Sequence, residues 1–132
     1  MIIHKLYNPE YRTKMAAFDY DWTLVKPKDT RIFPKDIDDW ELLYDTIIHK
    51  LRKYYEDGFM IVIFTNQTKQ WKCEQVINVM KSLHIPMFIP FGNYKSDKTQ
   101  GKPNTYIFTN FIGSFSINKK DSFYVGDALG RT

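Results

Sequence analysis

Four short apolar runs divide the chain, and longer amphipathic stretches lie between them. The runs are MAAF (15–18), FMIVIF (59–64), IPMFIPF (85–91) and SFYV (122–125). The second run is continuously apolar rather than alternating, which is typical of a strand buried on both faces of a parallel sheet. The pattern therefore predicts four strands, each separated from the next by enough residues for a helix.

Helical periodicity fills the intervals between these strands. Over residues 40–58, apolar side chains recur at the spacing of one helix face, namely Trp40, Leu43, Tyr44, Ile47, Ile48, Leu51, Tyr54 and Tyr55. Asp38 and Glu41 predict a capping pair at the start of this helix, and Gly58 predicts its C-terminal stop. A second helix is expected over residues 68–83, and a third from Pro103. Strands alternating with helices predict an α/β domain with a parallel sheet.

Composition and charge narrow the class of protein. The chain has 132 residues, 43% apolar and 26% charged, which suits one globular domain with one core. The single cysteine, Cys73, excludes an internal disulfide and a zinc site of several cysteines. No apolar run is as long as a membrane span, and the N-terminus lacks a signal-peptide layout. We therefore expect an intracellular protein of the cytoplasm or nucleus without a membrane partner, and the net charge of +4 favours polyanionic partners weakly.

Polar residues follow three of the predicted strands at the point where each strand ends. Asp19 and Asp21 follow the first, Thr65 and Asn66 the second, and Gly126 and Asp127 the fourth. Carboxyl ends of parallel strands converge at one edge of a sheet, where ligands bind. A hard cation such as Mg²⁺ neutralises the repulsion among Asp19, Asp21 and Asp127, and an aspartate beside it can attack phosphorus. The alternative is that these residues only form turns and cap helices.

The ordered set of motifs resembles the haloacid dehalogenase superfamily of phosphohydrolases. Its four motifs match FDYDWTLV (18–25), FTNQ (64–67), GKPN (101–104) and VGDALGR (125–131), so the resemblance covers nearly the whole chain. It implies a three-layer Rossmann-like parallel sheet, with Asp19 as nucleophile and Mg²⁺ ligand and Asp21 as general acid and base at the metal site. It also implies that Thr65, Asn66 and Lys102 hold the phosphate, that Asp127 binds Mg²⁺, and that Thr23 and Gly126 support the loops.

Within that superfamily the chain looks most like the 3′-phosphatase domain of polynucleotide kinase/phosphatase. RIFPKDIDDWELLY (31–44), IVIFTNQ (61–67) and VGDALGR are close to the wording of that family, whereas Trp22 stands where the superfamily usually has glycine. The resemblance implies removal of the 3′-phosphate from nucleic-acid ends in strand-break repair or end healing; DNA is favoured over RNA, but the sequence does not distinguish the two. It also implies a further strand and helix after the fourth motif, so we expect residues 1–132 to be one domain that lacks the C-terminal end of the fold.

The short intervals between motifs bear on the substrate. Neither residues 23–59 nor residues 65–102 have room for a folded cap, so the site is expected to be uncapped and open to a polymer end. Basic residues could then contact backbone phosphates, and Tyr20, Trp22 or Tyr94 could stack on a base. GNYKSDKT (92–99) has Asp97 in place of the second glycine of a phosphate-binding P-loop, so no nucleotide cofactor or kinase activity is expected.

Two other functions stay open at this stage. One is an uncapped phosphatase of small molecules, of the histidinol-phosphate or sugar-phosphate type. The other is a catalytically silent module that binds nucleic-acid ends. The intact pair Asp19 and Asp21 speaks against the silent module, and the absence of a Cys and His zinc loop speaks against some of the small-molecule enzymes. Oligomeric state is not indicated by the sequence.

Overall fold

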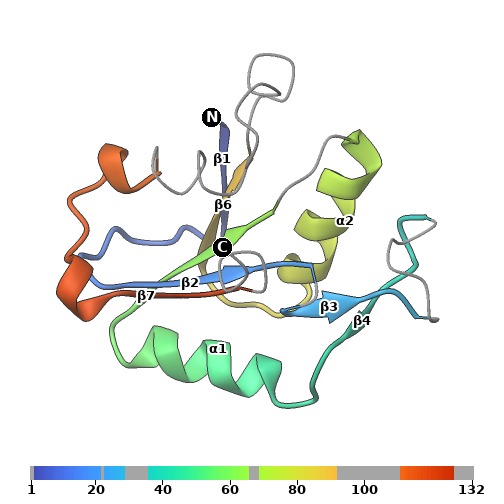
Figure 1. The fold of residues 1–132 in the computed structure, drawn as a ribbon, viewed down its shortest axis with the longest axis horizontal. Helices are drawn as coiled ribbons and strands as arrows, with labels where there is room; N and C mark the ends of the chain where they lie inside the picture. Colours follow the sequence, from blue (N-terminus) through green and yellow to red (C-terminus); the bar gives the residue numbers. More distant parts are fainter. Residues whose placement is uncertain (1, 22, 29–35, 66–68, 92–110, 127–132) are drawn as a thin grey trace.

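A computed structural model describes residues 2–21, 23–28, 36–65, 69–91 and 111–126 of the chain. Its main sheet has five strands: β1 (Ile2–Leu6), β2 (Met15–Asp19), β5 (Met60–Phe64), β6 (Met87–Phe91) and β7 (Phe123–Val125). They lie in the order β1-β6-β5-β2-β7 (Figure 1). The four strands predicted from the apolar runs are therefore confirmed, and β2, which carries Asp19, lies between β5 and β7.

The sheet is mixed rather than wholly parallel. β5 and β7 both pair with β2 in parallel, and β6 pairs with β5 in parallel, whereas β1 pairs with β6 antiparallel. β1 was not among the predicted strands, because it is short and most of it is only partly covered. The α/β class is confirmed, and the prediction of a purely parallel sheet is corrected by this edge strand.

Apolar side chains fill both faces of the sheet. On one face, Ala16, Phe18, Ile61 and Ile63 belong to a core that also includes buried residues of the two long helices. On the other face, Met15, Ala17, Met60, Val62 and Phe64 pack with Phe88 and with Phe111 from the helical turn 111–114. Strands covered on both faces explain why β2, β5 and β6 are buried along their whole length.

The first long helix begins later than its periodicity predicted. Helix α1 spans Ile47–Glu56, with Thr46 at its N-cap, so a start at Trp40 with Asp38 and Glu41 as caps is wrong. Residues Glu41–Leu42 instead form β4, which pairs antiparallel with β3 (Val25–Lys26). The apolar spacing predicted the wrong helix start because Trp40, Leu42 and Leu43 do pack against the core. They do so in extended rather than helical backbone.

The predicted helix end and the second helix agree better with the structure. Gly58 has φ +97° and donates its N–H to the carbonyl of Tyr55, which is the left-handed geometry of a helix stop. Helix α2 spans Gln70–Lys81 within the predicted 68–83. The predicted start of a third helix at Pro103 lies outside the described residues, and Lys119–Asp121 form a short 3₁₀ turn before β7. Nothing in the described parts forms a helix suited to crossing a membrane.

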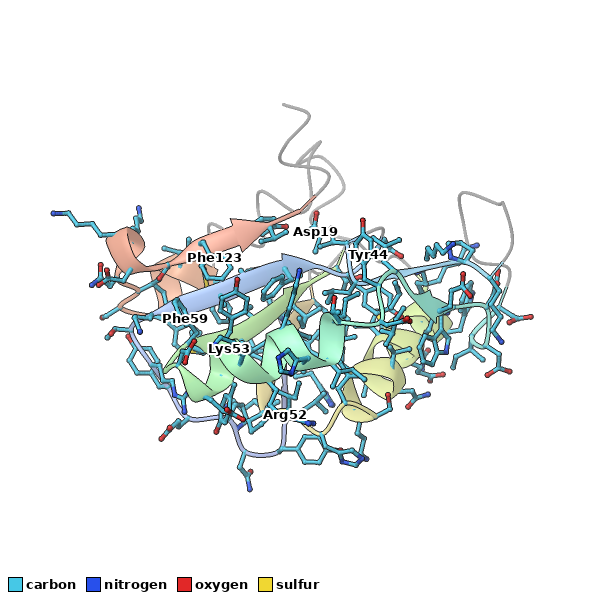
Figure 2. The ribbon with its side chains drawn as sticks, turned by 90° about the horizontal axis from the view of Figure 1, so that it is seen from below. Asp19, Tyr44, Arg52, Lys53, Phe59 and Phe123 are labelled. Atoms are coloured by element: carbon cyan, nitrogen blue, oxygen red, sulfur yellow. The ribbon has the colours of Figure 1, made fainter. Side chains whose placement is uncertain are left out.

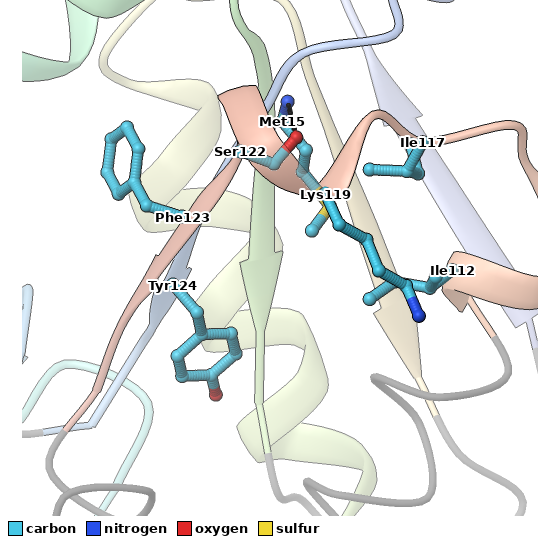
Figure 3. Close-up of a pocket in the computed structure, with 7 residues that line it drawn as sticks. All are labelled: Met15, Ile112, Ile117, Lys119, Ser122, Phe123 and Tyr124. Atoms are coloured by element: carbon cyan, nitrogen blue, oxygen red, sulfur yellow. Dashed lines mark hydrogen bonds between the residues drawn. The ribbon is translucent and has the colours of Figure 1, made fainter.

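A cavity of about 380 Å³ lies beside the start of β2 and β7. Figure 3 shows its lining side chains, which are Met15, Ile112, Ile117, Lys119, Ser122, Phe123 and Tyr124. The ring of Tyr124 extends from this cavity toward the other end of the strands, where its hydroxyl meets Asp19. The cavity thus lies at the opposite end of these strands from the predicted site, and the side chain of Tyr124 contacts both.

Candidate active site

Three strand ends meet where the motifs predicted a site. Asp19 is the last residue of β2 and pairs in register with Phe64, after which Thr65 follows. On the other side of β2, Phe18 pairs with Val125, after which Gly126 follows. Figure 2 shows Asp19 at the tip of the β2 arrow, at the opposite end of the sheet from Phe59 and Phe123. The structure therefore brings Asp19, Thr65 and Gly126 together at one edge.

Asp19 is held tightly in this position. Only 5% of the residue is exposed, and its Oδ1 accepts a hydrogen bond from the hydroxyl of Tyr124 on β7. Burial, together with the adjacent Asp19 carboxylate, raises the pKa of Tyr124 well above its ordinary value, so that this hydroxyl stays protonated and donates. A phenol that donates to a carboxylate oxygen fixes the orientation of the whole carboxylate group.

Gly126 makes the approach of β7 to Asp19 possible. A Cβ built on Gly126 would lie 2.5 Å from Oδ2 of Asp19 and 2.5 Å from Cε1 of Tyr124. No real Cβ fits at such distances, so any larger residue would push the carboxylate or the tyrosine ring aside. The predicted supporting role of Gly126 thus has a concrete physical basis, which is close contact with the Asp19 side chain.

Tyr20 continues β2 into the turn that carries Asp21. Its N–H donates to the carbonyl of Phe64 at 2.9 Å, and its own carbonyl accepts from the N–H groups of Leu24 and Val25 at 3.0 and 3.2 Å. Its ring is fully buried, and burial raises its pKa well above the ordinary value. The suggestion that Tyr20 stacks on a substrate base is therefore wrong, because a fully covered ring offers no face to a ligand.

Asp21 lies in the turn beyond Tyr20 and is more open than Asp19. Its side chain is 38% exposed, and Oδ1 lies 2.7 Å from the ammonium of Lys72 in α2. Asp21 forms an isolated bridge with Val25, the first residue of β3, so the β3–β4 pair begins next to the candidate site. Thr23 lies between Asp21 and Val25 in the sequence and is half-buried. One carboxylate is thus buried and fixed, and the other faces solvent with a cation beside it.

Several predicted site residues fall in parts of the chain that the structure does not describe. These are Asn66, Lys102 and Asp127, together with Trp22 and Tyr94. Thr65 is described and is 2% exposed at the end of β5. In the described part of the chain, no group of three or more His, Cys, Asp or Glu side chains is placed to hold a metal ion, and the carboxylates at the site are those of Asp19 and Asp21.

Two residues of the site were missed in the sequence. Tyr124 contacts Asp19 across 105 residues of chain, and Lys72 contacts Asp21 across 51. Neither belongs to a recognisable motif, because a tyrosine in a strand or a lysine in a helix is commonplace. The only hint in the sequence was that Lys72 falls on the apolar side of its helix, three residues before Gln75 and four before Val76.

Comparisons with known proteins identify the family of the chain. The family model described as polynucleotide kinase 3 phosphatase matches residues 14–132. An uncharacterized 20.8 kDa protein of Autographa californica nuclear polyhedrosis virus is 39% identical over 127 residues, which cover 91% of this chain and 69% of that protein. The bifunctional polynucleotide phosphatase/kinase of Schizosaccharomyces pombe is 34% identical over 131 residues, and the polynucleotide 3′-phosphatase ZDP of Arabidopsis thaliana is 31% identical over 142.

The lengths of these proteins differ widely. The matches cover 89% of this chain in both cellular relatives, but only 31% of the yeast protein and 20% of the plant protein. The match to the family model covers one region of this chain, from just before β2 to residue 132, and this region contains all four motifs. The chain therefore belongs to the polynucleotide kinase 3 phosphatase family and is, in class, a phosphatase.

Proposed function

We propose that the chain removes the phosphate from 3′ ends of nucleic acid, DNA rather than RNA, in strand-break repair or end healing. The observation that carries the proposal is the position of Asp19: a carboxylate with 5% exposure, oriented by Tyr124, at the carboxyl end of a central strand. The family supports a nucleic-acid end as the substrate, because its cellular members named above are a polynucleotide phosphatase/kinase and a polynucleotide 3′-phosphatase.

In the proposed reaction, a carboxylate oxygen of Asp19 attacks the phosphorus and the bond to the 3′ oxygen breaks. Asp21 gives its proton to that departing oxygen, which leaves as the 3′-hydroxyl. Asp21 then takes a proton from water, which attacks the aspartyl-phosphate and releases inorganic phosphate with the Asp19 carboxylate restored. Thr65, Asn66 and Lys102 hold the phosphoryl oxygens during both steps, with Thr23 and Gly126 supporting the loops.

The donor set suits Mg²⁺. Asp19 and Asp21 offer only oxygen ligands, and no cysteine or histidine lines the described part of the site, which fits a hard cation. Asp19, Asp21 and Asp127 would hold the ion. When bound, Mg²⁺ neutralises charge on the phosphoryl oxygens and lowers the repulsion between an anionic nucleophile and an anionic substrate.

Access to the site favours a polymer end over a small molecule. In the described parts of residues 23–59, the structure contains the β3–β4 pair and α1, and no separate cap domain. We infer an uncapped Rossmann-like domain of the haloacid dehalogenase type. Lys69, at the start of α2, and Lys50, on α1, are exposed and add to the net positive charge that attracts nucleic acid.

The test is phosphate release from three substrates in the presence of Mg²⁺. A 3′-phosphorylated oligodeoxynucleotide is compared with its 5′-phosphorylated isomer and with histidinol phosphate, and an oligoribonucleotide is assayed beside the DNA. Release from the 3′ end, abolished by EDTA and restored by Mg²⁺, is expected. Release from histidinol phosphate alone would contradict the proposed substrate.

A pair of variants tests the nucleophile. Asp19→Asn should abolish turnover and leave binding of the 3′-phosphorylated oligonucleotide largely intact. Asp45→Asn serves as the control, because Asp45 is an exposed aspartate just before α1. Turnover by Asp19→Asn at the rate of the unmodified chain would show that another residue attacks phosphorus. Binding without turnover in the unmodified chain itself would instead support a silent binding module.

A further inference from the structure

A buried lysine stands behind the more exposed carboxylate of the site. Lys72 lies in the first turn of α2, and only 7% of the residue is exposed. Lysine is almost never buried without a partner, because removing an ammonium from water is costly. Its Nζ lies 2.7 Å from Oδ1 of Asp21 and 3.4 Å from Oε1 of Gln75, and 5.2 Å from the centre of the Tyr20 ring.

Gln75 holds this lysine and the surrounding backbone in place. It is 1% exposed, and its Oε1 accepts from both the hydroxyl of Tyr20, at 3.1 Å, and Lys72. Its Nε2 donates to the carbonyls of Asp36 and Ile37, both at 3.2 Å. Both amide protons and the amide oxygen are therefore used, so that Gln75 is fixed in one orientation.

We propose that Lys72 is a positioning residue that fixes the orientation of the Asp21 carboxylate at the site. The inference rests on the proposed function, which gives Asp21 its role. Asp21 stands in a turn with a side chain 38% exposed, so the groups that contact its carboxylate decide its rotamer. Lys72 projects from a rigid helix, its ammonium is held by Gln75, and it selects the rotamer that brings Oδ1 to 2.7 Å. Small displacements of a catalytic group are known to cost large factors in rate.

A purely structural ion pair would also explain the contact between Lys72 and Asp21. The structural role and the positioning role predict different rates when the leaving group of the substrate is changed. Proton donation matters for an alkoxide, such as the 3′ oxygen of a nucleotide, which is a poor leaving group. It matters little for 2,4-dinitrophenolate, which departs as a stable anion. The ratio kcat/KM reports the chemistry only up to formation of the aspartyl-phosphate, so it isolates the step in which Asp21 acts as acid.

The experiment measures kcat/KM of Lys72→Met for a 3′-phosphorylated oligodeoxynucleotide and for 2,4-dinitrophenyl phosphate. We expect a loss of about 100-fold on the oligonucleotide, which is the usual size of a general-acid effect, and a loss below about threefold on the aryl ester. Lys72→Arg keeps the charge and should recover at least part of the oligonucleotide activity. Lys81→Met, at an exposed lysine in the last turn of the same helix, is the matched control and should leave both ratios unchanged.

A double variant tests whether Lys72 acts through Asp21. In the background of Asp21→Asn, adding Lys72→Met should cause no further loss, since the group that Lys72 positions is already gone. Equal losses on both substrates, or additive losses in the double variant, would overturn the proposal. If Lys72→Met does not fold, as judged by circular dichroism, Lys72→Gln replaces it in the same comparisons.

Failure of the proposed function would look different. An unmodified chain that hydrolyses 2,4-dinitrophenyl phosphate but not the oligonucleotide would refute the proposed substrate. The same leaving-group comparison, made with a primary alkyl phosphate, would then still decide the role of Lys72. Unchanged kcat/KM of Lys72→Met on every substrate would refute the positioning role while leaving the phosphatase intact.

Discussion

The hydroxyl of Tyr124 donates a hydrogen bond to Oδ1 of Asp19, joining residues 105 positions apart in the sequence. Because β7 pairs in parallel with β2, this contact ties the central strand to its neighbour at the point where the chemistry is proposed. The ring of Tyr124 also packs beside Phe64 of β5, at a centroid distance of 5.6 Å. Three adjacent strands therefore support one carboxylate.

Removing only the Tyr124 hydroxyl should weaken catalysis more than folding. Tyr124→Phe keeps the ring and its packing, but Asp19 loses a donor of the kind worth about 1.5–3 kcal/mol to a charged group. We expect kcat/KM for a 3′-phosphorylated oligonucleotide to fall about tenfold. Tyr11→Phe is the control, because its hydroxyl donates to the carbonyl of Ser116 at 2.8 Å on an exposed surface. Equal kcat/KM in both variants would show that the Asp19 contact has no catalytic value.

Adding one methyl group at Gly126 should disable the site. In Gly126→Ala the new Cβ collides with Oδ2 of Asp19 and with the Tyr124 ring, each 2.5 Å away. Displacement of a reacting group by about 1 Å costs on the order of 100-fold in rate, and we expect a loss of this size. Gly113→Ala is the matched control, since a Cβ placed on Gly113 would meet nothing within 4 Å. Full activity in Gly126→Ala would mean that Asp19 is not held where the structure places it.

High pH should destabilise the fold through Tyr20. Burial raises the pKa of its phenol, so the folded state keeps the proton at pH values where the unfolded chain has already lost it. The stabilising contribution is present below pH of about 10 and declines as pH rises further, by up to about 1.4 kcal/mol per pH unit. Urea unfolding of the unmodified chain and of Tyr20→Phe at pH 8 to 11 measures it. Tyr20→Phe should lose less stability with pH, and parallel curves would contradict the prediction.

The stop of α1 should be sensitive to a side chain at Gly58. Its φ of +97° is a conformation that L-residues rarely adopt, although the nearest atom to a Cβ there, Cε of Lys14, is 3.6 Å away. Strain rather than collision therefore sets the cost, and Gly58→Ala should lower the free energy of unfolding by about 1–2 kcal/mol. Because Gly58 lies at the far end of β5 from Thr65, kcat should not change in samples that are fully folded. A fall in kcat without a fall in stability would contradict this.

Local sequence patterns predicted those strands and helices whose position follows from the order of apolar residues within the segment itself. Continuous apolar runs located β2, β5, β6 and β7, since strands covered on both faces need no polar positions. The start of α1 could not be predicted from apolar spacing. Trp40 and Leu43 are partly buried in an extended segment, and the same burial would be expected if they were helical. In that extended segment, the N–H of Leu43 bonds to the carbonyl of Leu24, a partner that helical spacing cannot reveal.

The same distinction applies to the site. Asp19, Thr65 and Gly126 were found because each directly follows a predicted strand, and parallel pairing brings strand ends together. Tyr124, Lys72 and Gln75 act through side chains that reach across the fold, so their roles depend on distances that no local spacing encodes. Tyr20 was misjudged for a related reason: its place between two site aspartates suggests exposure, but strand alternation turns its ring into the core.

The backbone at Lys28 and the backbone at residues 36 and 37 are both bonded to well-buried side chains. The N–H of Lys28 donates to Oδ1 of Asp39, and the carbonyls of Asp36 and Ile37 accept from Gln75. Gln75 also accepts from Lys72, whose ammonium contacts Oδ1 of Asp21. The backbone at residues 36 and 37 is therefore linked to Asp21 through two side chains. A substitution that shifts this backbone would displace Gln75 and Lys72, and through them the more exposed carboxylate of the site.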